Sequence, residues 1–361
     1  MPKIELKSAF NLPKKILKWI ETATDNDLFR INLKLLSKEL NYDFYDLITF
    51  FIKAVNEGLF NLSWEYHCPH CNAVPGFTHN FSNLKSEDFC QLCNVSFRNT
   101  LDSNIEVTFT INPAVYALPD EISQQYMNTM MSAAKVKNYK IPDEFLSGLE
   151  VMNNHLFYEY FGDQVLSVEE SLQIQRITIL FTDIKGSTSL YSKYGDVKSY
   201  NVVRDHFKIL FDKVINNHGT IVKTIGDSIM ASFIKPHEAV KAALEAQKEF
   251  IKSKFGDIGK LDIKMGIHSG SVIVVNLNER IDYFGNTVNV ASRIESLSEG
   301  GAIWFSKDIY NDPKVMQYLK KHKNEFESKV YRKKAKMKGL EEYHELYNIN
   351  LYENIKNSQA S

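Results

Sequence analysis

In the second half of the chain, segments with apolar residues at the spacing typical of strands alternate with segments at the spacing typical of helices. Ile177, Ile179, Leu180 and Phe181 form a short apolar run that is typical of a strand buried on both faces. After it, the pattern predicts a helix at 186–218, a hairpin at 220–234 and a helix at 236–255. Two strands at 261–267 and 271–276, a helix at 286–298 and a strand at 302–306 follow. A last strand is expected at 343–349. This order predicts an α+β fold with one sheet covered by helices on one face, most simply in a ferredoxin-like arrangement.

The first half of the chain is patterned differently. Residues 27–66 carry apolar positions at helical spacing, then a helix stop at Gly58, then alternating apolar positions. Short helices followed by a strand resemble a winged-helix layout. Residues 105–115 alternate like a half-buried strand, and residues 120–172 are helix-prone.

Composition narrows the class of protein. The 361 residues are 44% hydrophobic, which is ample for packed domains. No apolar run approaches the roughly 18 residues that cross a bilayer, and the N-terminus lacks a secretory signal pattern, so we expect a cytoplasmic protein without a membrane span. Residues 1–166 carry 14 Lys and Arg against 20 Asp and Glu, whereas residues 167–361 carry 29 against 24. The acidic first half argues against nucleic-acid binding, and the basic second half suits a small polyanionic substrate.

The four cysteines lie in two CxxC motifs, with residues 72–89 between them: Cys68, Cys71, Cys90 and Cys93. This spacing predicts a zinc ribbon. Four thiolates fill a tetrahedral site and leave no open position, so one Zn²⁺ per chain would be structural. A redox dithiol pair and an iron–sulfur cluster are the alternatives, and His67 or His70 could replace a thiolate.

Two carboxylates stand where strands end. Asp183 follows the apolar run at 177–181, and Asp227 lies in the turn of the hairpin within GTIVKTIGDSIMASF. Two carboxylates on neighbouring strand ends can hold two hard cations, and Mg²⁺ prefers few carboxylates plus phosphate oxygens. Gly186, Ser187 and Thr188 then open a helix whose N–H groups suit a phosphate. The alternatives are an ordinary Gly-Asp turn and plain helix capping.

Four motifs together carry a resemblance to a known family: FTDIKGST, VKTIGDSIMASF, GIHSG and IDYFGNTVNVASRIES. In this order they resemble the catalytic domain of class III nucleotidyl cyclases, over about 177–349. The resemblance implies a ferredoxin-like domain that forms a head-to-tail homodimer with active sites between the subunits. It also implies two Mg²⁺ or Mn²⁺ ions per site.

The same resemblance implies roles for individual residues. Asp183 and Asp227 would bind the metal ions, Lys223 the purine ring nitrogen, and Asp282 the exocyclic amine. Further along the chain, Asn289 would orient the ribose, Arg293 would stabilise charge on the α-phosphate, and Lys338 would contact the phosphates. Asn289 and Arg293 are four residues apart and so share one helix face. His268 in GIHSG is expected to be structural rather than a catalytic base.

A donor and an acceptor at the two base-recognition positions match adenine, so ATP is expected rather than GTP. The implied reaction is attack of the ribose 3′-oxygen on the α-phosphorus, which gives 3′,5′-cyclic AMP and pyrophosphate. The alternatives are a guanylate cyclase, a nucleotide-binding pseudocyclase with a signalling role, and a zinc-ribbon transcription factor with a cyclase-like sensor.

Residues 1–165 resemble an uncharacterised domain found ahead of some bacterial cyclase domains, for which a regulatory or docking role is a hypothesis. We therefore expect four segments. Residues 1–66 would form a helical, winged-helix-like region and residues 67–118 a zinc ribbon with a strand. Residues 119–172 would form a helical linker and residues 173–352 the cyclase domain.

Overall fold

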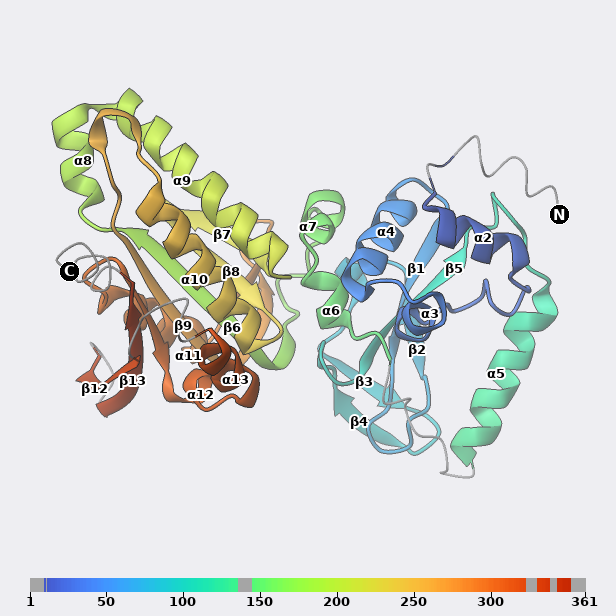
Figure 1. Cartoon of the computed structure of the whole chain (residues 1–361). Helices are drawn as coiled ribbons and strands as arrows, with labels where there is room; N and C mark the ends of the chain where they lie inside the picture. The colour runs from blue at the N-terminus through green and yellow to red at the C-terminus, as the bar shows by residue number, and fades with distance from the viewer. Residues whose placement is uncertain (1–9, 11, 136–144, 323–329, 338–342, 352–361) are drawn as a thin grey trace. The chain divides into compact units, whose positions relative to one another are not determined.

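The computed structural model describes residues 10, 12–135, 145–322, 330–337 and 343–351. The chain divides into two compact units (Figure 1). Unit 1 contains Met1–Ile174 and Val274–Ile281, and unit 2 contains Gln175–Ile273 and Asp282–Ser361.

The described part of unit 1 starts with three short helices: α2 (Lys14–Thr22), α3 (Leu33–Leu40) and α4 (Phe44–Asn56). The side chains of Asn32 and Asp43 accept hydrogen bonds from the first free N–H groups of α3 and α4, so both helices begin at these capping residues. The chain then enters an antiparallel sheet of order β2-β1-β5, with β1 at Phe60–Tyr66, β2 at Gly76–Thr78 and β5 at Ile105–Ile111.

The rest of unit 1 surrounds this sheet. A separate hairpin pairs β3 (Glu87–Cys90) with β4 (Val95–Arg98), and a 3₁₀ turn, η1, spans Phe81–Asn83. Three further helices follow: α5 (Asp120–Lys135), α6 (Gly148–Met152) and α7 (His155–Phe161). The core is aromatic, since Phe51 packs on Phe60 and Phe109, and Trp64 packs on Phe81 and Phe157.

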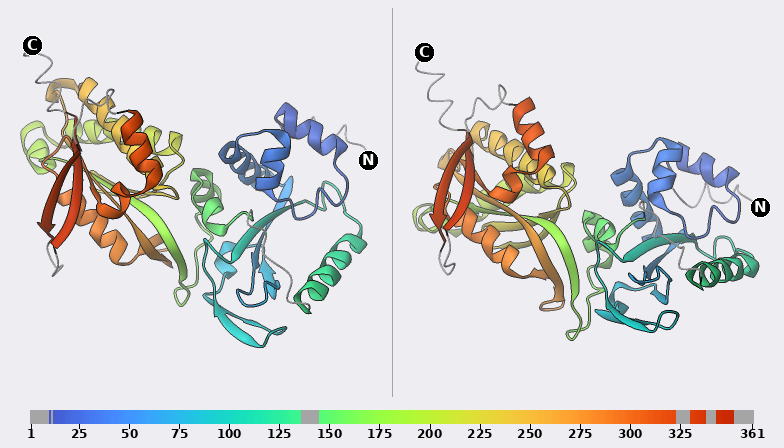
Figure 2. Two further views of the ribbon diagram at one scale, coloured as in Figure 1. Left: turned by 60° about the horizontal axis from the view of Figure 1, so that its bottom comes forward. Right: turned by 90° about the horizontal axis from the view of Figure 1, so that it is seen from below.

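Unit 2 is built on one mixed sheet of order β12-β13-β11-β9-β6-β8-β7, with β10 paired to β9. Its strands are β6 (Leu172–Ile184), β7 (Thr220–Ile225), β8 (Ser228–Phe233), β9 (Ile263–Asn276), β10 (Ile281–Phe284), β11 (Ala302–Ser306), β12 (Val330–Lys336) and β13 (Tyr343–Asn350). Figure 2 shows the β12–β13 pair in red at one edge of this sheet. The helices between the strands are α8 (Ser187–Tyr194), α9 (Asp196–Asn216), α10 (Pro236–Lys252), α11 (Asn286–Ser296), α12 (Lys307–Tyr310) and α13 (Pro313–Lys321), with a 3₁₀ turn η2 at Gly256–Ile258.

The α+β class is confirmed, but the helices cover both faces of the sheet rather than one. Ile303 and Phe305 of β11 belong to the core cluster that contains the buried residues of α9 and α10. Ala302 and Trp304, which alternate with them, pack with Val290 and Ile294 of α11. Since successive side chains of a strand point to opposite faces, α11 covers the face opposite α9 and α10.

Two local predictions were wrong, and one strand was missed. The helix expected at 186–218 is two helices, because Gly195 between them adopts φ 76° and ψ 168°, a conformation favoured by glycine. The two strands expected at 261–276 are one continuous strand, β9. β12 was not anticipated, because its exposed, lysine-rich sequence lacks a strand pattern.

Candidate active site

Asp183 and Asp227 meet at the end of the central strand pair. β6 and β8 are antiparallel with Thr182 opposite Ile229, and Asp227 lies in the turn that precedes β8. The hydroxyl of Ser228 donates to Asp183 Oδ1 at 2.8 Å. The N–H of Ile184 donates to Asp227 Oδ2 at 3.2 Å. The pairing of the strands therefore places the two carboxylates side by side, as the sequence predicted.

Their proximity raises the electrostatic cost of holding two negative charges. The pKa of Asp227 is raised, first by burial and second by the negative charge of Asp183. A divalent cation would relieve this repulsion, because like-charged carboxylates that share a site favour a bound cation or a proton. The donor set, carboxylate oxygens beside an open helix end, suits the Mg²⁺ or Mn²⁺ that the family implies.

Two charged residues that the sequence reasoning missed complete this cluster. Lys264 of β9 places Nζ 2.9 Å from Asp183 Oδ2 and 3.9 Å from Glu295 Oε1. Burial opposes the charged form of Lys264, but the hydrogen bond to Asp183 and the negative charges of Asp183, Glu295 and Asp227 together outweigh burial, so the pKa is raised. Burial, and then the charge of Asp183, raise the pKa of Glu295 to about 7. The available signal was a lone lysine in the apolar strand sequence IKMGI.

The helix that follows Asp183 begins where the sequence predicted. Gly186 adopts φ 73° and precedes α8, whose first N–H groups, at Ser187 and Thr188, have no partner within the helix. The side chain of Ser187 also hydrogen-bonds to Asp227. The start of α8 therefore lies against the two carboxylates.

Lys223 and Asp282, the two predicted base-recognition residues, are in direct contact. Lys223 Nζ donates to Asp282 Oδ2 at 2.5 Å. The N–H of Tyr283 donates to the other oxygen, Oδ1, at 2.8 Å. The side chain of Asp282 is only 9% exposed and that of Lys223 is 34% exposed, so the lysine compensates a buried carboxylate. The two residues come from β7 and β10 and are brought together only by the fold.

The other predicted residues lie on or near α11. Asn289 is exposed and Arg293 is half-buried on this helix. Lys338 lies outside the described residues. His268 is half-buried, its Nδ1 lies 2.9 Å from Ser306 Oγ, and burial lowers its pKa to about 4, in keeping with a structural role.

Comparison with known families agrees with these motifs. Residues 169–350, half of the chain, match the family model described as the Adenylate and Guanylate cyclase catalytic domain. The chain belongs to this cyclase family. Residues 6–228 also match a family of unknown function (DUF5939), and this match runs from the first half of the chain into the cyclase domain.

Individual relatives of the cyclase domain carry both activities in their names. An adenylate cyclase of Anabaena cylindrica is 30% identical over 191 residues, which are 48% of this chain and 37% of that protein. The soluble guanylate cyclase gcy-31 of Caenorhabditis elegans is 33% identical over 171 residues, 41% of this chain and 24% of that protein. An adenylate cyclase of Lachancea kluyveri is 28% identical over 168 residues, 40% of this chain and 9% of that protein. The chain thus spans well under half the length of these relatives.

Two solved cyclase structures are also similar to this chain. The adenylyl cyclase CyaB from P. aeruginosa is 25% identical and covers 50% of this chain and 95% of that chain, with a TM-score of 0.43. The guanylyl cyclase Cya2 is 22% identical and covers 49% of this chain and 92% of that chain, also with a TM-score of 0.43.

Outside the cyclase domain, the four cysteines of unit 1 come together as predicted. Cys68 Sγ lies 3.5 Å from Cys93 Sγ, and Cys71 Sγ lies 3.5 Å from Cys90 Sγ. Four thiolates on a tetrahedral zinc ion have sulfurs roughly 3.8 Å apart, so this arrangement fits the ion. Each CxxC is followed by an asparagine with positive φ, Asn72 at 60° and Asn94 at 58°, which turns the chain back after the second cysteine.

His67 does not join the cysteines. It is fully buried, and its Nε2 lies 2.7 Å from Glu106 Oε2. Arg30 pairs with Glu65 and, at 3.4 Å, with Glu106. His67 therefore contacts the buried Glu106 of β5 rather than the predicted zinc site.

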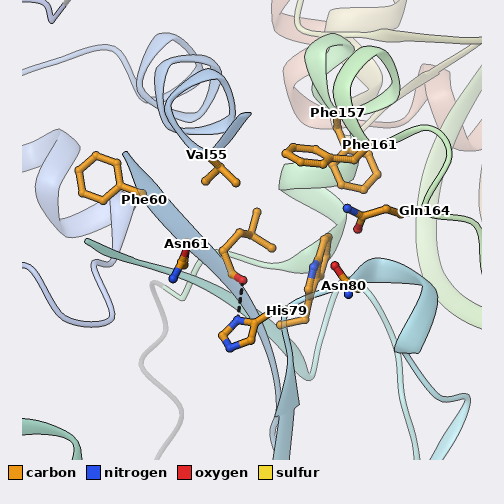
Figure 3. A pocket seen from close by; sticks show the side chains of 10 residues that line it. Val55, Phe60, Asn61, His79, Asn80, Phe157, Phe161 and Gln164 are labelled. Carbon is orange, nitrogen blue, oxygen red and sulfur yellow. Dashed lines mark hydrogen bonds between the residues drawn. The ribbon is translucent and has the colours of Figure 1, made fainter. Parts of the chain in front are cut away.

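Unit 1 also contains a cavity of about 330 Å³. Figure 3 shows Phe157 and Phe161 of α7 beside Val55 of α4, with Gln164 and Asn80 at the same opening. Nδ1 of His79 donates to the carbonyl oxygen of Leu62 at 3.0 Å.

No described helix in either unit is long and apolar enough to span a bilayer.

Proposed function

We propose that this chain is an adenylate cyclase that converts ATP into 3′,5′-cyclic AMP and pyrophosphate. The observation that supports ATP over GTP is the contact between Lys223 and Asp282. Adenine offers an acceptor at N1 and a donor at its exocyclic amine, which match a lysine and a carboxylate. Guanine presents the opposite order, a donor at N1 and an acceptor at O6, at the same two places.

The remaining roles follow the family pattern. Asp183 and Asp227 hold two divalent ions, which supply charge neutralisation and lower the pKa of the ribose 3′-hydroxyl when bound. The helix start at 186–188 and Lys338 hold the phosphates, and Asn289 orients the ribose. Arg293 stays charged and stabilises the negative charge that develops on the α-phosphate. The 3′-oxygen bonds to the α-phosphorus, the bond to the β-phosphate bridging oxygen breaks, and the hydroxyl proton passes to solvent.

We further propose a homodimer in which each active site uses Asp183 and Asp227 of one copy and the base-binding residues of the other. The cysteine cluster would hold one structural Zn²⁺ per chain. Four free thiols in one cluster suit a reducing compartment, which supports a cytoplasmic location with access to the ATP pool.

The test is an activity assay of the purified chain with ATP or GTP and Mg²⁺ or Mn²⁺. Wild type should yield cyclic AMP, and Asp183→Asn should lose at least about a hundredfold in activity because metal binding is impaired. Asp257→Asn removes an exposed carboxylate from the same unit and should leave activity unchanged.

The base assignment is tested with the double variant Lys223→Glu/Asp282→Cys, which should lose its discrimination against GTP. Cyclic GMP formed by wild type as fast as cyclic AMP would overturn the base assignment. Nucleotide binding without any cyclic product would instead identify a pseudocyclase.

A further inference from the structure

Lys264 occupies the position from which a cation would contact Asp183. Its Nζ is 2.9 Å from Asp183 Oδ2, and both side chains are 23% exposed. The other oxygen of Asp183 accepts from Ser228. Both oxygens of this carboxylate are therefore engaged by residues of the chain itself.

A second carboxylate lies next to the same lysine. Glu295 Oε1 is 3.9 Å from Lys264 Nζ, and within the described part of the chain this buried oxygen has no hydrogen-bond partner. Glu295 Oε2 accepts from Ser296. A buried carboxylate oxygen without a donor is costly, and a small rotation of the lysine would satisfy it.

We propose that Lys264 is a built-in counter-ion that alternates between two carboxylates. Without metal it neutralises Asp183 and keeps the site formed. When a divalent ion binds Asp183, Lys264 moves to Glu295. The two residues are thus positioning residues that set the metal affinity of the site, and this inference rests on the proposed metal-binding role of Asp183.

The physical reason is charge repulsion. A lysine hydrogen-bonded to a metal ligand lies within about 4 Å of a bound divalent ion, where repulsion between the charges is strong even at the dielectric of a protein surface. The lysine must therefore leave Asp183, and Glu295, whose Oε1 lies 3.9 Å from Lys264 Nζ, is the carboxylate beside it. Any free energy that Lys264 contributes to the metal-free site is subtracted from metal binding.

The experiment measures Mn²⁺ binding to the full-length chain by electron paramagnetic resonance, without nucleotide. Lys264→Met keeps the length of the side chain and removes its charge. We expect it to bind Mn²⁺ about tenfold more tightly than wild type and to melt at a lower temperature in EDTA. Lys208→Met, which removes an exposed lysine paired with Asp205, is the matched control and should change neither value.

A double-mutant cycle tests the second half of the proposal. Glu295→Gln should weaken Mn²⁺ binding in the wild-type background, because Lys264 loses its alternative partner. In the Lys264→Met background the same substitution should have no effect. An equal effect of Glu295→Gln in both backgrounds would show that Glu295 acts on the metal directly and would overturn the exchange.

The outcomes separate this inference from the proposed function. Suppose that Lys264→Met binds Mn²⁺ as tightly as wild type or more weakly, and that Asp183→Asn abolishes binding. This result would refute the counter-ion role alone. Mn²⁺ binding that Asp183→Asn leaves intact would refute the metal site, and with it both proposals.

Discussion

Single charged residues in this protein are stabilised by specific partners. In unit 1, Arg30 pairs with Glu65 and Glu106, whose side chains are 6% and 7% exposed, and Thr108 donates a further hydrogen bond to Glu65. Each buried charge depends on its neighbours, because removing one partner leaves the other charge without compensation.

Arg30→Met should therefore destabilise the protein by roughly 3–5 kcal/mol, since it leaves two buried glutamates without their cation. Urea unfolding followed by tryptophan fluorescence measures the change. Arg98→Met removes the same group from an ion pair whose side chains are 78% and 63% exposed, and should cost less than about 1 kcal/mol. Equal effects of the two substitutions would contradict the network.

His268 predicts a pH dependence of stability in unit 2. Its folded pKa is lowered to about 4 by burial, which outweighs the opposing charge of Asp308, and His344 lowers it further. The unfolded chain takes up a proton near pH 6.5, whereas the folded chain does not until about pH 4, so stability falls as the pH drops through this window.

Between pH 7.5 and pH 5 this histidine should account for a loss of about 2 kcal/mol. His268→Gln should reduce the loss by that amount when unfolding is measured at both pH values. A variant with the same acid sensitivity as wild type would show that His268 is accessible to protons in the folded state.

At the scale of elements, close packing of α11 on β9 positions several predicted site residues. A Cβ on Gly266 would lie 2.1 Å from the backbone nitrogen of Glu295, and one on Gly270 would lie 2.5 Å from Thr287 Oγ1. The glycines of GIHSG thus allow a helix to approach a strand, where the sequence predicted a break between two strands. The approach holds Asn289, Arg293 and Glu295 in place.

Gly266→Ala should accordingly cost about 3 kcal/mol through overpacking, because the obstructing atoms belong to the backbone. Gly76→Ala is the control, since its Cβ would meet only Tyr66 at 3.8 Å. Differential scanning calorimetry should show a lower melting temperature for the first variant alone, and an unchanged transition would mean that α11 can move away freely.

The β3–β4 hairpin, which carries Cys90 and Cys93 of the cysteine cluster, is a second element that can be tested. Elemental analysis of the wild-type chain should find one zinc ion, and Cys90→Ser should lose it and destabilise unit 1, because structural zinc sites contribute directly to folding. Phe89→Ser changes an exposed neighbour and should retain the metal. A Cys90→Ser variant with full zinc content would exclude the four-cysteine site.

At the scale of the whole molecule, the proposed active site needs two copies of the chain. Asp183 and Asp227 of one subunit would then face Asn289 and Arg293 of the other. The two-fold symmetry of a homodimer gives two equivalent sites, so each inactive variant can rescue the other.

Coexpressed Asp183→Asn and Arg293→Ala chains should therefore recover about a quarter of the wild-type activity, since half of the dimers are mixed and each mixed dimer has one intact site. Each variant alone should be inactive. A coexpressed mixture that remains inactive would show that both residues act within one copy.

Local features were predictable from the sequence because neighbouring residues determine them. The helix start of α8 after Gly186, the spacing of the cysteines and the position of Asp183 at the end of β6 follow from patterns a few residues long. The break at Gly195 was missed although it is local, because the apolar periodicity of α8 continues into α9.

By itself, the sequence determined the order of the four motifs, which identifies the cyclase family, and the spacing of the cysteines. The tertiary structure decided which charges meet. Lys223 and Asp282 are 59 residues apart, and Lys264 and Asp183 are 81 residues apart. Their contacts depend on strand order and register across the sheet, which short patterns do not encode. The same pairing makes Lys264, a single residue in an apolar strand, part of the proposed metal site.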